Sequence, residues 1–209
     1  MKNRIFITTL TIIIATLFLG SCKTLNQFAD SLNNLQRLEF KLDEVNNFRL
    51  AGVNLSNIKS VSDISLMDGI KLTKAFSEKR LPAQFVLNVD AKNPNDGTGG
   101  SKQSSATLTA LDWKLYIDDK ETIAGNINKE LVIPGTGSSE TIPLVMNIDL
   151  YEFFGNKGYE DIINLALAIG GQGGSASRLK LDARPTVKTP LGNINYPNRI
   201  TIVDKGWTN

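Results

Sequence analysis

The sequence predicts a mainly β protein, an antiparallel β-sandwich with one or two added helices. Segments in which apolar and polar residues alternate recur along the chain, which is the pattern of half-buried strands. Turn signals rich in Gly, Pro, Asn and Asp separate these segments. One stretch, 158–169, instead repeats its apolar residues at helical spacing. Many short strands with few helices favour two packed antiparallel sheets.

Several segments share the alternation that a half-buried strand requires. They are residues 38–45, 48–55, 85–91, 111–117, 122–132, 142–148, 179–183 and 194–203. Asn46-Asn47 is the turn expected between the first two, and Asp118-Asp119-Lys120 is a tight-turn candidate. Pro94 and Pro185 should each end a strand, because proline donates no hydrogen bond to the ladder. Glycines and serines predict a loop over 95–105.

Two segments predict helices. Ser65 and Asp68 have the spacing of a capping box, which starts a helix that reaches about Glu78. The apolar residues of that helix spread widely around its axis, so no single packing face is predicted. Residues 158–169 carry one apolar stripe instead. The glycines of 170–174 should end this second helix as a cap and linker. A phosphate-binding loop is disfavoured, because such a loop precedes its helix and carries G-K-[ST], which this run does not.

The chain begins with a secretory signal. A basic start precedes an apolar run over 5–19, and small residues then lead to a cysteine. That run is near 15 residues long, short of the roughly 20 that span a membrane. Leu19-Gly20-Ser21-Cys22 resembles the lipobox of bacterial lipoproteins, which implies that residues 1–21 are removed as a signal peptide and that Cys22 is acylated. An uncleaved membrane anchor and a chance cysteine are the alternatives.

Residues 22–37 are expected to tether the domain, either as a short amphipathic helix or as a flexible polar spacer. Lys23 follows the cysteine without the aspartate that retains many such lipoproteins at the inner membrane of enteric bacteria. Residues 23–28 also lack the acids of surface-export signals in Bacteroidetes-type bacteria. We expect an outer-membrane lipoprotein of the bacterial envelope that faces the periplasm. Asp30-Ser31-Leu32 resembles an O-glycosylation acceptor of such envelopes.

The composition excludes several kinds of chemistry. The chain has no histidine, which removes Ser–His and Cys–His catalysis. Cys22 is the only cysteine, so once it is acylated a transition-metal site is not expected. Without Lys2 and Arg4 the basic residues number 23 − 2 = 21, equal to the 21 acidic ones. This balance disfavours nucleic-acid binding, and the membrane should be held by acyl chains on Cys22. No cofactor is expected.

An order of motifs runs through residues 85–203. It consists of Asn93-Pro94-Asn95, the 112–119 segment, Gly125, the 133–138 segment, Ile142-Pro143-Leu144, Pro185 and Leu191-Gly192. This order resembles the late-embryogenesis-abundant type 2 proteins, also called the WHy or desiccation-related domain. The resemblance implies a sandwich of the fibronectin-III or immunoglobulin kind with a helix packed on it. It also implies a role in stress tolerance, without an established catalytic site.

The chain departs from that family in two places. Residues 38–80 add strand and helix material, and a long Gly-rich insertion follows Asn95. We therefore expect one domain over 38–205, with the family-like core at 82–203 and the N-terminal extension before it. The tract from Phe40 to Asn95 also resembles lipoproteins of Bacteroidetes-type bacteria.

Two features are candidates for ligand chemistry. Asp118, Asp119 and Glu121 cluster as in a calcium site or a carboxylate pair, although a solvated hairpin turn is favoured. Trp113 is expected in the core rather than as a sugar-stacking platform, because it falls at an inward position of an alternating strand.

Ser56–Lys59 and Ser177–Lys180 match the S-x-x-K signature of penicillin-binding enzymes. The companion S-D-N is absent, and Lys188-Thr189-Pro190 replaces K-T-G. The leading hypothesis is thus a non-enzymatic, lipid-anchored envelope protein with a structural or stress-protective role. The alternative is a module that binds an unidentified protein or polymer through the end loops of the sandwich. A Ser–Lys or carboxylate hydrolase is the least favoured hypothesis.

Overall fold

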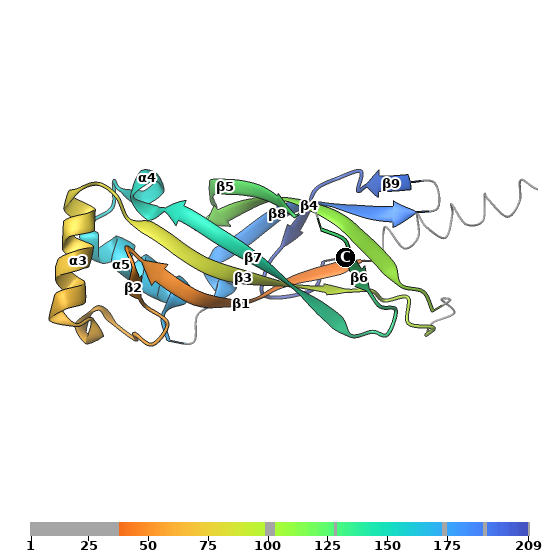
Figure 1. The fold of residues 1–209 in the computed structure, drawn as a ribbon, viewed down its shortest axis with the longest axis horizontal. Helices are drawn as coiled ribbons and strands as arrows, with labels where there is room; N and C mark the ends of the chain where they lie inside the picture. The colour runs from red at the N-terminus through yellow and green to blue at the C-terminus, as the bar shows by residue number, and fades with distance from the viewer. Residues whose placement is uncertain (1–37, 99–102, 128, 173–174, 190–191, 209) are drawn as a thin grey trace, which may run out of the picture.

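A computed structural model describes residues 38–98, 103–127, 129–172, 175–189 and 192–208. Two antiparallel sheets pack face to face into an elongated sandwich, and helices lie at one end of it (Figure 1). The predicted fold class, a mainly β antiparallel sandwich with added helices, is confirmed. In the part of the chain that the structure describes, no helix is both long and apolar enough to cross a membrane.

The first sheet has four strands in the order β2-β1-β3-β7. Their bounds are Glu39–Leu50 for β1, Val53–Asn54 for β2, Pro82–Lys92 for β3 and Ser139–Asp149 for β7. β3 and β7 pair without a register shift from Pro82 opposite Asp149 to Lys92 opposite Ser139. The strand that opens the N-terminal extension therefore lies inside this sheet, next to β3.

The second sheet is ordered β10-β8-β4-β5, and two short strands lie off this path. Their bounds are Ala106–Ile117 for β4, Lys120–Ile127 for β5, Leu131–Ile133 for β6, Leu179–Thr189 for β8, Gly192–Asn195 for β9 and Ile200–Ile202 for β10. β6 extends the pairing of β4, and β9 extends the pairing of β8. Along one edge, β4 thus pairs first with β6 and then with β5, and β8 pairs first with β10 and then with β9.

One hydrophobic core fills the space between the sheets. Alternate residues of each strand point into it, as the period of two requires. Leu87 and Leu115 are fully buried, and Trp113 is 7 % exposed. The Trp113 ring lies so close to Gly125 on β5 that a Cβ there would stand 2.3 Å from it. The prediction that Trp113 belongs to the core is confirmed.

Three α-helices lie among the described residues, and two of them match the predictions. α3 (Leu66–Ser77) begins at Ser65, whose side chain accepts a hydrogen bond from the Asp68 amide. α5 (Tyr159–Gly170) buries the predicted apolar stripe, and the Gly171 amide caps its last turn by donating to Leu167. α4 (Leu150–Phe154) was not predicted, because five residues are too few for a periodic signal.

The turn predicted at Asn46-Asn47 is wrong. β1 runs through both residues as one strand, with register shifts between Leu42 and Val45 and between Asn46 and Arg49. Asn47 takes a positive φ of 56°, a conformation that asparagine tolerates better than most residues. The turn signal therefore marks bulges, which bend and twist the strand without ending it.

The break predicted at Pro185 is wrong as well, because β8 continues through it. The Pro185 carbonyl accepts from the Tyr196 amide, on the side away from β4. The Pro185 nitrogen also points away from β4. On that side the strand paired with β8 changes from β10, whose pairing ends at Ala183, to β9, whose pairing begins at Thr186. No ladder bond is lost there, so proline is tolerated.

Two predicted strands are each divided in the structure. The 122–132 segment becomes β5 and β6, which pair with opposite halves of β4. The 194–203 segment becomes β9 and β10, which pair with opposite halves of β8. Alternation alone missed these breaks, because apolar residues of both halves pack against the same core.

The C-terminal residues close one side of the sandwich along β1. The Leu42 amide donates to the Val203 carbonyl, and Phe40 exchanges hydrogen bonds with Thr208. The Trp207 ring receives the ammonium groups of Lys41 and Lys92 at 5.8 and 5.7 Å from its centroid. The sheets are thus joined on the β1 side by main-chain hydrogen bonds.

Candidate functional sites

The Asn93-Pro94-Asn95 motif lies where β3 ends, in the interior of the protein. Asn93 is 0 % exposed and Asn95 is 3 % exposed, although both side chains are polar. The Asn93 amide donates to the carbonyls of Ser104 at 2.8 Å and Ile133 at 3.3 Å. Its oxygen accepts from the main-chain and side-chain nitrogens of Asn95 at 3.1 and 2.9 Å. We call these contacts the Asn93 network.

The Asn93 network connects three segments that are distant in sequence. The end of β3, the start of β4 and the end of β6 meet there, and the Ser104 amide also donates to the Asn95 carbonyl. Gly135 passes so close that a Cβ would stand 2.3 Å from the carbonyls of Asn95 and Ser104. Satisfied and enclosed in this way, the motif holds the end of the sandwich together and presents no reactive group.

The carboxylates of the β4–β5 hairpin are engaged in ion pairs on the surface. Asp118 and Asp119 both have positive φ, so they form the tight turn that the sequence predicts. Asp118 accepts from the Arg178 guanidinium at 2.6 Å, and Asp119 pairs with Lys180 at 3.1 Å. Each carboxylate thus has its own cation, which favours the hairpin interpretation over a calcium site. Throughout the described ranges no cluster of three metal-ligating side chains occurs.

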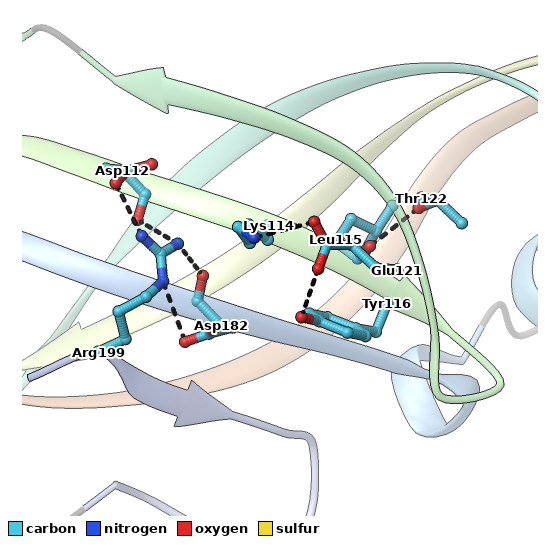
Figure 2. Close-up of polar contacts among 8 residues, drawn as sticks. All are labelled: Asp112, Lys114, Leu115, Tyr116, Glu121, Thr122, Asp182 and Arg199. Carbon is cyan, nitrogen blue, oxygen red and sulfur yellow. Dashed lines mark hydrogen bonds and ion pairs between the residues drawn. The ribbon is translucent and has the colours of Figure 1, made fainter.

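Glu121 forms a small network with two side chains of β4 (Figure 2). Lys114 donates to one carboxylate oxygen at 2.9 Å and the Tyr116 hydroxyl to the other at 2.8 Å. The hydrogen bond from Lys114, with that from Tyr116, holds the pKa of Glu121 below its usual value. The hydrogen bond between Tyr116 and Glu121 raises the pKa of the Tyr116 hydroxyl. A carboxylate held ionised in this way is a poor general acid.

Arg199 connects β4 and β8 on the same outer face (Figure 2). Its guanidinium contacts the Asp112 carboxylate at 2.8 Å and the Asp182 carboxylate at 3.2 Å, and it donates to the Asp182 carbonyl at 2.6 Å. The Thr122 hydroxyl donates to the Leu115 carbonyl nearby. Opposite charges are paired across this face, and these ion pairs stabilise the pairing of the strands. The face therefore offers a charged ligand no patch of one sign of charge.

The S-x-x-K matches do not form a catalytic pair. Ser56 lies in a turn, where its amide donates to the Asn54 side chain. Ser177 lies in the short 3-10 turn Ala176–Arg178, and Lys180, already in β8, pairs with Asp119. Neither serine opens an α-helix, as the enzyme signature requires.

The Gly-rich tract after α5 serves as a helix end. A Cβ on Gly170 would stand 1.9 Å from the Phe48 ring, so glycine is needed for the helix to reach the sheet. The Gln172 amide then donates to the Ile58 carbonyl. These contacts agree with the predicted cap and linker, although residues 173–174 lie outside the described residues.

A groove along α3 is a surface feature that the sequence did not predict. It has a volume of about 610 Å³ and runs between α3 and the 3-10 turn Val61–Asp63, with Tyr159 at one side. Leu66, Met67 and Ile70 of α3 are 81 %, 67 % and 56 % exposed. The available signal was the wide spread of apolar residues around this helix, which buries only Leu72 completely.

Cys22, the tether 22–37 and Asp30-Ser31-Leu32 lie outside the described residues, so their predictions stand untested. The expected outer-membrane location, the acyl anchor and the bacterial origin are likewise predictions.

Comparison with known proteins gives only distant similarities. No family model and no curated protein matches the chain. A crystal structure of a protein from Archaeoglobus fulgidus is similar with a TM-score of 0.31 and 8 % identity, over 55 % of this chain and 78 % of that one. The solution structure of AT1g01470 from Arabidopsis thaliana has a TM-score of 0.32 and 12 % identity, over 79 % and 82 %.

A third solution structure is of a candidate late embryogenesis abundant (LEA) protein, At2g46140.1. It has a TM-score of 0.31 and 18 % identity, over 90 % of this chain and 83 % of that one. Likenesses of this size carry no argument about activity. The resemblance to the late-embryogenesis-abundant type 2 family therefore continues to depend on the motifs in the sequence.

Proposed function

We propose that this protein is a non-enzymatic, lipid-anchored envelope protein of bacteria with a structural or stress-protective role. The signal segment and Cys22 support the anchor, and the motif order over 85–203 supports the protective role. The observation that carries the proposal is the Asn93 network. The sharpest motif of the resemblance lies in the interior with its hydrogen bonds made, which is the position of residues that maintain a fold.

The surface charges also support a protective role over a catalytic one. Asp112, Asp118, Asp119, Glu121 and Asp182 each pair with a lysine or an arginine. A hydrolytic site needs a nucleophile or base beside an orienting partner in a shaped pocket. Reproducible hydrolysis by the purified chain that disappears on a single Asp, Glu or Ser substitution, with folding intact, would contradict the proposal.

The anchor is tested by mass spectrometry of the mature N-terminus, which should begin at an acylated Cys22. Cys22→Ser should release the protein from membranes, and a chain that still begins at Met1 would contradict the anchor. For the proposed periplasmic orientation, protease added to intact cells should spare the domain. Rapid digestion from whole cells would place it on the outer surface instead.

The protective role is tested by drying cells that produce the chain and counting survivors after rehydration. Cells with the native chain should survive better than cells with Trp113→Ala, in which the fold is weakened. Cys22→Ser separates the need for the anchor from the need for the domain. Equal survival of all three strains would reject the protective role.

A second candidate function is a binding module that acts through one end of the sandwich. The exposed Leu66, Met67 and Ile70 favour it, since apolar side chains gathered beside a groove are typical of a binding surface. This surface lies outside the residues that carry the family resemblance.

A further inference from the structure

The groove along α3 changes from apolar to polar along its length. Val61, Ile64 and Leu66 line it near the start of the helix, whereas Thr73, Lys74 and Ser77 line it near the end. Leu66 and Ser77 are eleven residues apart, which is about 16 Å along a helix. The volume of about 610 Å³ lies within the range of small-molecule sites. The groove therefore has the length and the graded polarity of a single-chain amphiphile.

Lys74 is the only charged residue among those that line the groove. Its ammonium lies 3.8 Å from the Glu78 carboxylate, and both side chains are more than half exposed. Such a pair contributes little, because water screens it. The Lys74 charge thus remains able to attract an anionic group at the polar end of the groove. The other lysine of α3, Lys71, is held at 3.0 Å by Asp68.

Gly69 keeps the groove open. Glycine inside a helix costs about 1 kcal/mol relative to alanine, so its presence calls for a reason. A Cβ at Gly69 would meet no atom within 4 Å, so packing inside the described protein supplies none. The missing side chain instead leaves space on the groove wall, where Gly69 is one of the lining residues.

Two other occupants fit the groove less well. A second copy that docks through α3 would use a helix of 12 residues, about 18 Å long and about 10 Å across. That face is well below the roughly 800 Å² per partner of a stable interface.

The N-terminal tether is also a poor fit, because β1 starts at the far end of the sandwich from α3 (Figure 1). The 12 residues of β1 cover about 40 Å. A helical 22–37 would span only about 24 Å and would not reach the groove. A flexible spacer would reach it only by ordering most of its 16 residues along the sandwich, which costs conformational entropy.

We propose that the groove along α3 binds a single-chain amphiphile with an anionic head group, its hydrocarbon chain beside Leu66 and Ile70 and its head group at Lys74. This deepens the second candidate function, the binding module, and it is independent of the acyl anchor. The chain would cover the exposed apolar side chains, and the head group would take the charge of Lys74.

The test uses the full chain in phosphatidylcholine nanodiscs and a twelve-carbon fatty acid that carries a diazirine. After irradiation, mass spectrometry maps the labelled peptides, which should come from 60–78 and from the separate segment that contains Tyr159. Gly69→Leu fills the groove and should lower this labelling by about tenfold. Because leucine is a better helix former than glycine, this variant should fold at least as well as the native chain.

Two controls separate the groove from general stickiness. Val145→Leu enlarges an exposed apolar side chain on β7 and should leave the labelling of 60–78 unchanged. Lys74→Gln should lower labelling by the acid about two- to fivefold and leave labelling by the matched twelve-carbon alcohol unchanged.

Labelling spread over the surface, absent from 60–78, or equal in the native chain and Gly69→Leu would overturn the proposal. An equal effect of Lys74→Gln on acid and alcohol would overturn the role of the head group. Survival on drying is measured separately, so failure of the protective role and failure of the amphiphile site give different results.

Discussion

At the end of the sandwich where β3 stops, the polar side chains of Asn93 and Asn95 are buried and hydrogen-bonded. The opposite end is where α3 lies (Figure 1). The apolar side chains of Leu66, Met67 and Ile70 are exposed there. The first end has used its polar groups to join three segments of chain, so it is complete by itself. The second end has unused apolar surface, which is where a ligand gains most from contact.

The comparison also separates the part of the chain that carries the family resemblance from the part that does not. The Asn93 network lies in the family-like region, whereas α3 belongs to the N-terminal extension. The extension also supplies β1, which lies inside the first sheet, so α3 is the part of it that leaves apolar surface uncovered.

The largest effect is expected in the core that both ends share. Trp113→Ala should lower the free energy of unfolding by about 3–5 kcal/mol, because it empties a large aromatic site against Gly125. Chemical denaturation followed by circular dichroism measures this loss. A loss below about 1 kcal/mol would mean that the ring contributes little to the core.

The Asn93 network should give the next largest effect. Asn93→Ala removes the donor to the carbonyls of Ser104 and Ile133, so these buried groups lose a partner. The expected loss is about 1–3 kcal/mol in the free energy of unfolding. Asn147→Ala on the exposed side of β7 is the matched control and should change stability by less than about 0.5 kcal/mol. If both variants lose the same amount, the Asn93 network is not what holds this end.

Tyr196 should make stability depend on alkaline pH. Burial raises the pKa of its hydroxyl, which lies enclosed without a well-formed hydrogen bond. The unfolded chain ionises from about pH 10 while the folded chain does not, so stability is complete below that pH and falls above it. The loss should be about 1.4 kcal/mol at pH 11.

Tyr196→Phe should remove this part of the alkaline loss and change stability little at neutral pH. Denaturation at pH 7 and pH 11 compares the two proteins. An unchanged pH dependence in the variant would show that the Tyr196 hydroxyl is accessible in the folded protein.

The smallest effect is expected at α3 and has the opposite sign. Gly69→Ala should raise the free energy of unfolding by up to about 1 kcal/mol, because alanine favours the helix and its Cβ meets open space. Gly125→Ala is the contrasting variant and should destabilise, since a Cβ there meets the Trp113 ring. Thermal unfolding of both variants measures the difference. A destabilised Gly69→Ala would mean that the groove wall is already filled.

The sequence determined the kind of element at most positions, because alternation and helical spacing report burial directly. It placed β3, β4, β7, α3 and α5 and located the Asp118-Asp119 turn. The turn and strand-break signals failed where pairing with a distant strand overrode the local preference. Asn46-Asn47 became bulges because β3 continues beside them, and Pro185 stayed in a strand because its outer partner changes there.

The candidate sites divide in the same way. The sequence indicated that Asn93-Pro94-Asn95 matters and that the 118–121 carboxylates cluster near a turn. Only the tertiary structure decided that Asn93 faces the Ser104 and Ile133 carbonyls, since these residues come from different segments. The groove along α3 could be found only from the tertiary structure. Whether an apolar residue of α3 faces the core or the solvent is decided by the elements packed against the helix, and these contacts lie far apart in the sequence.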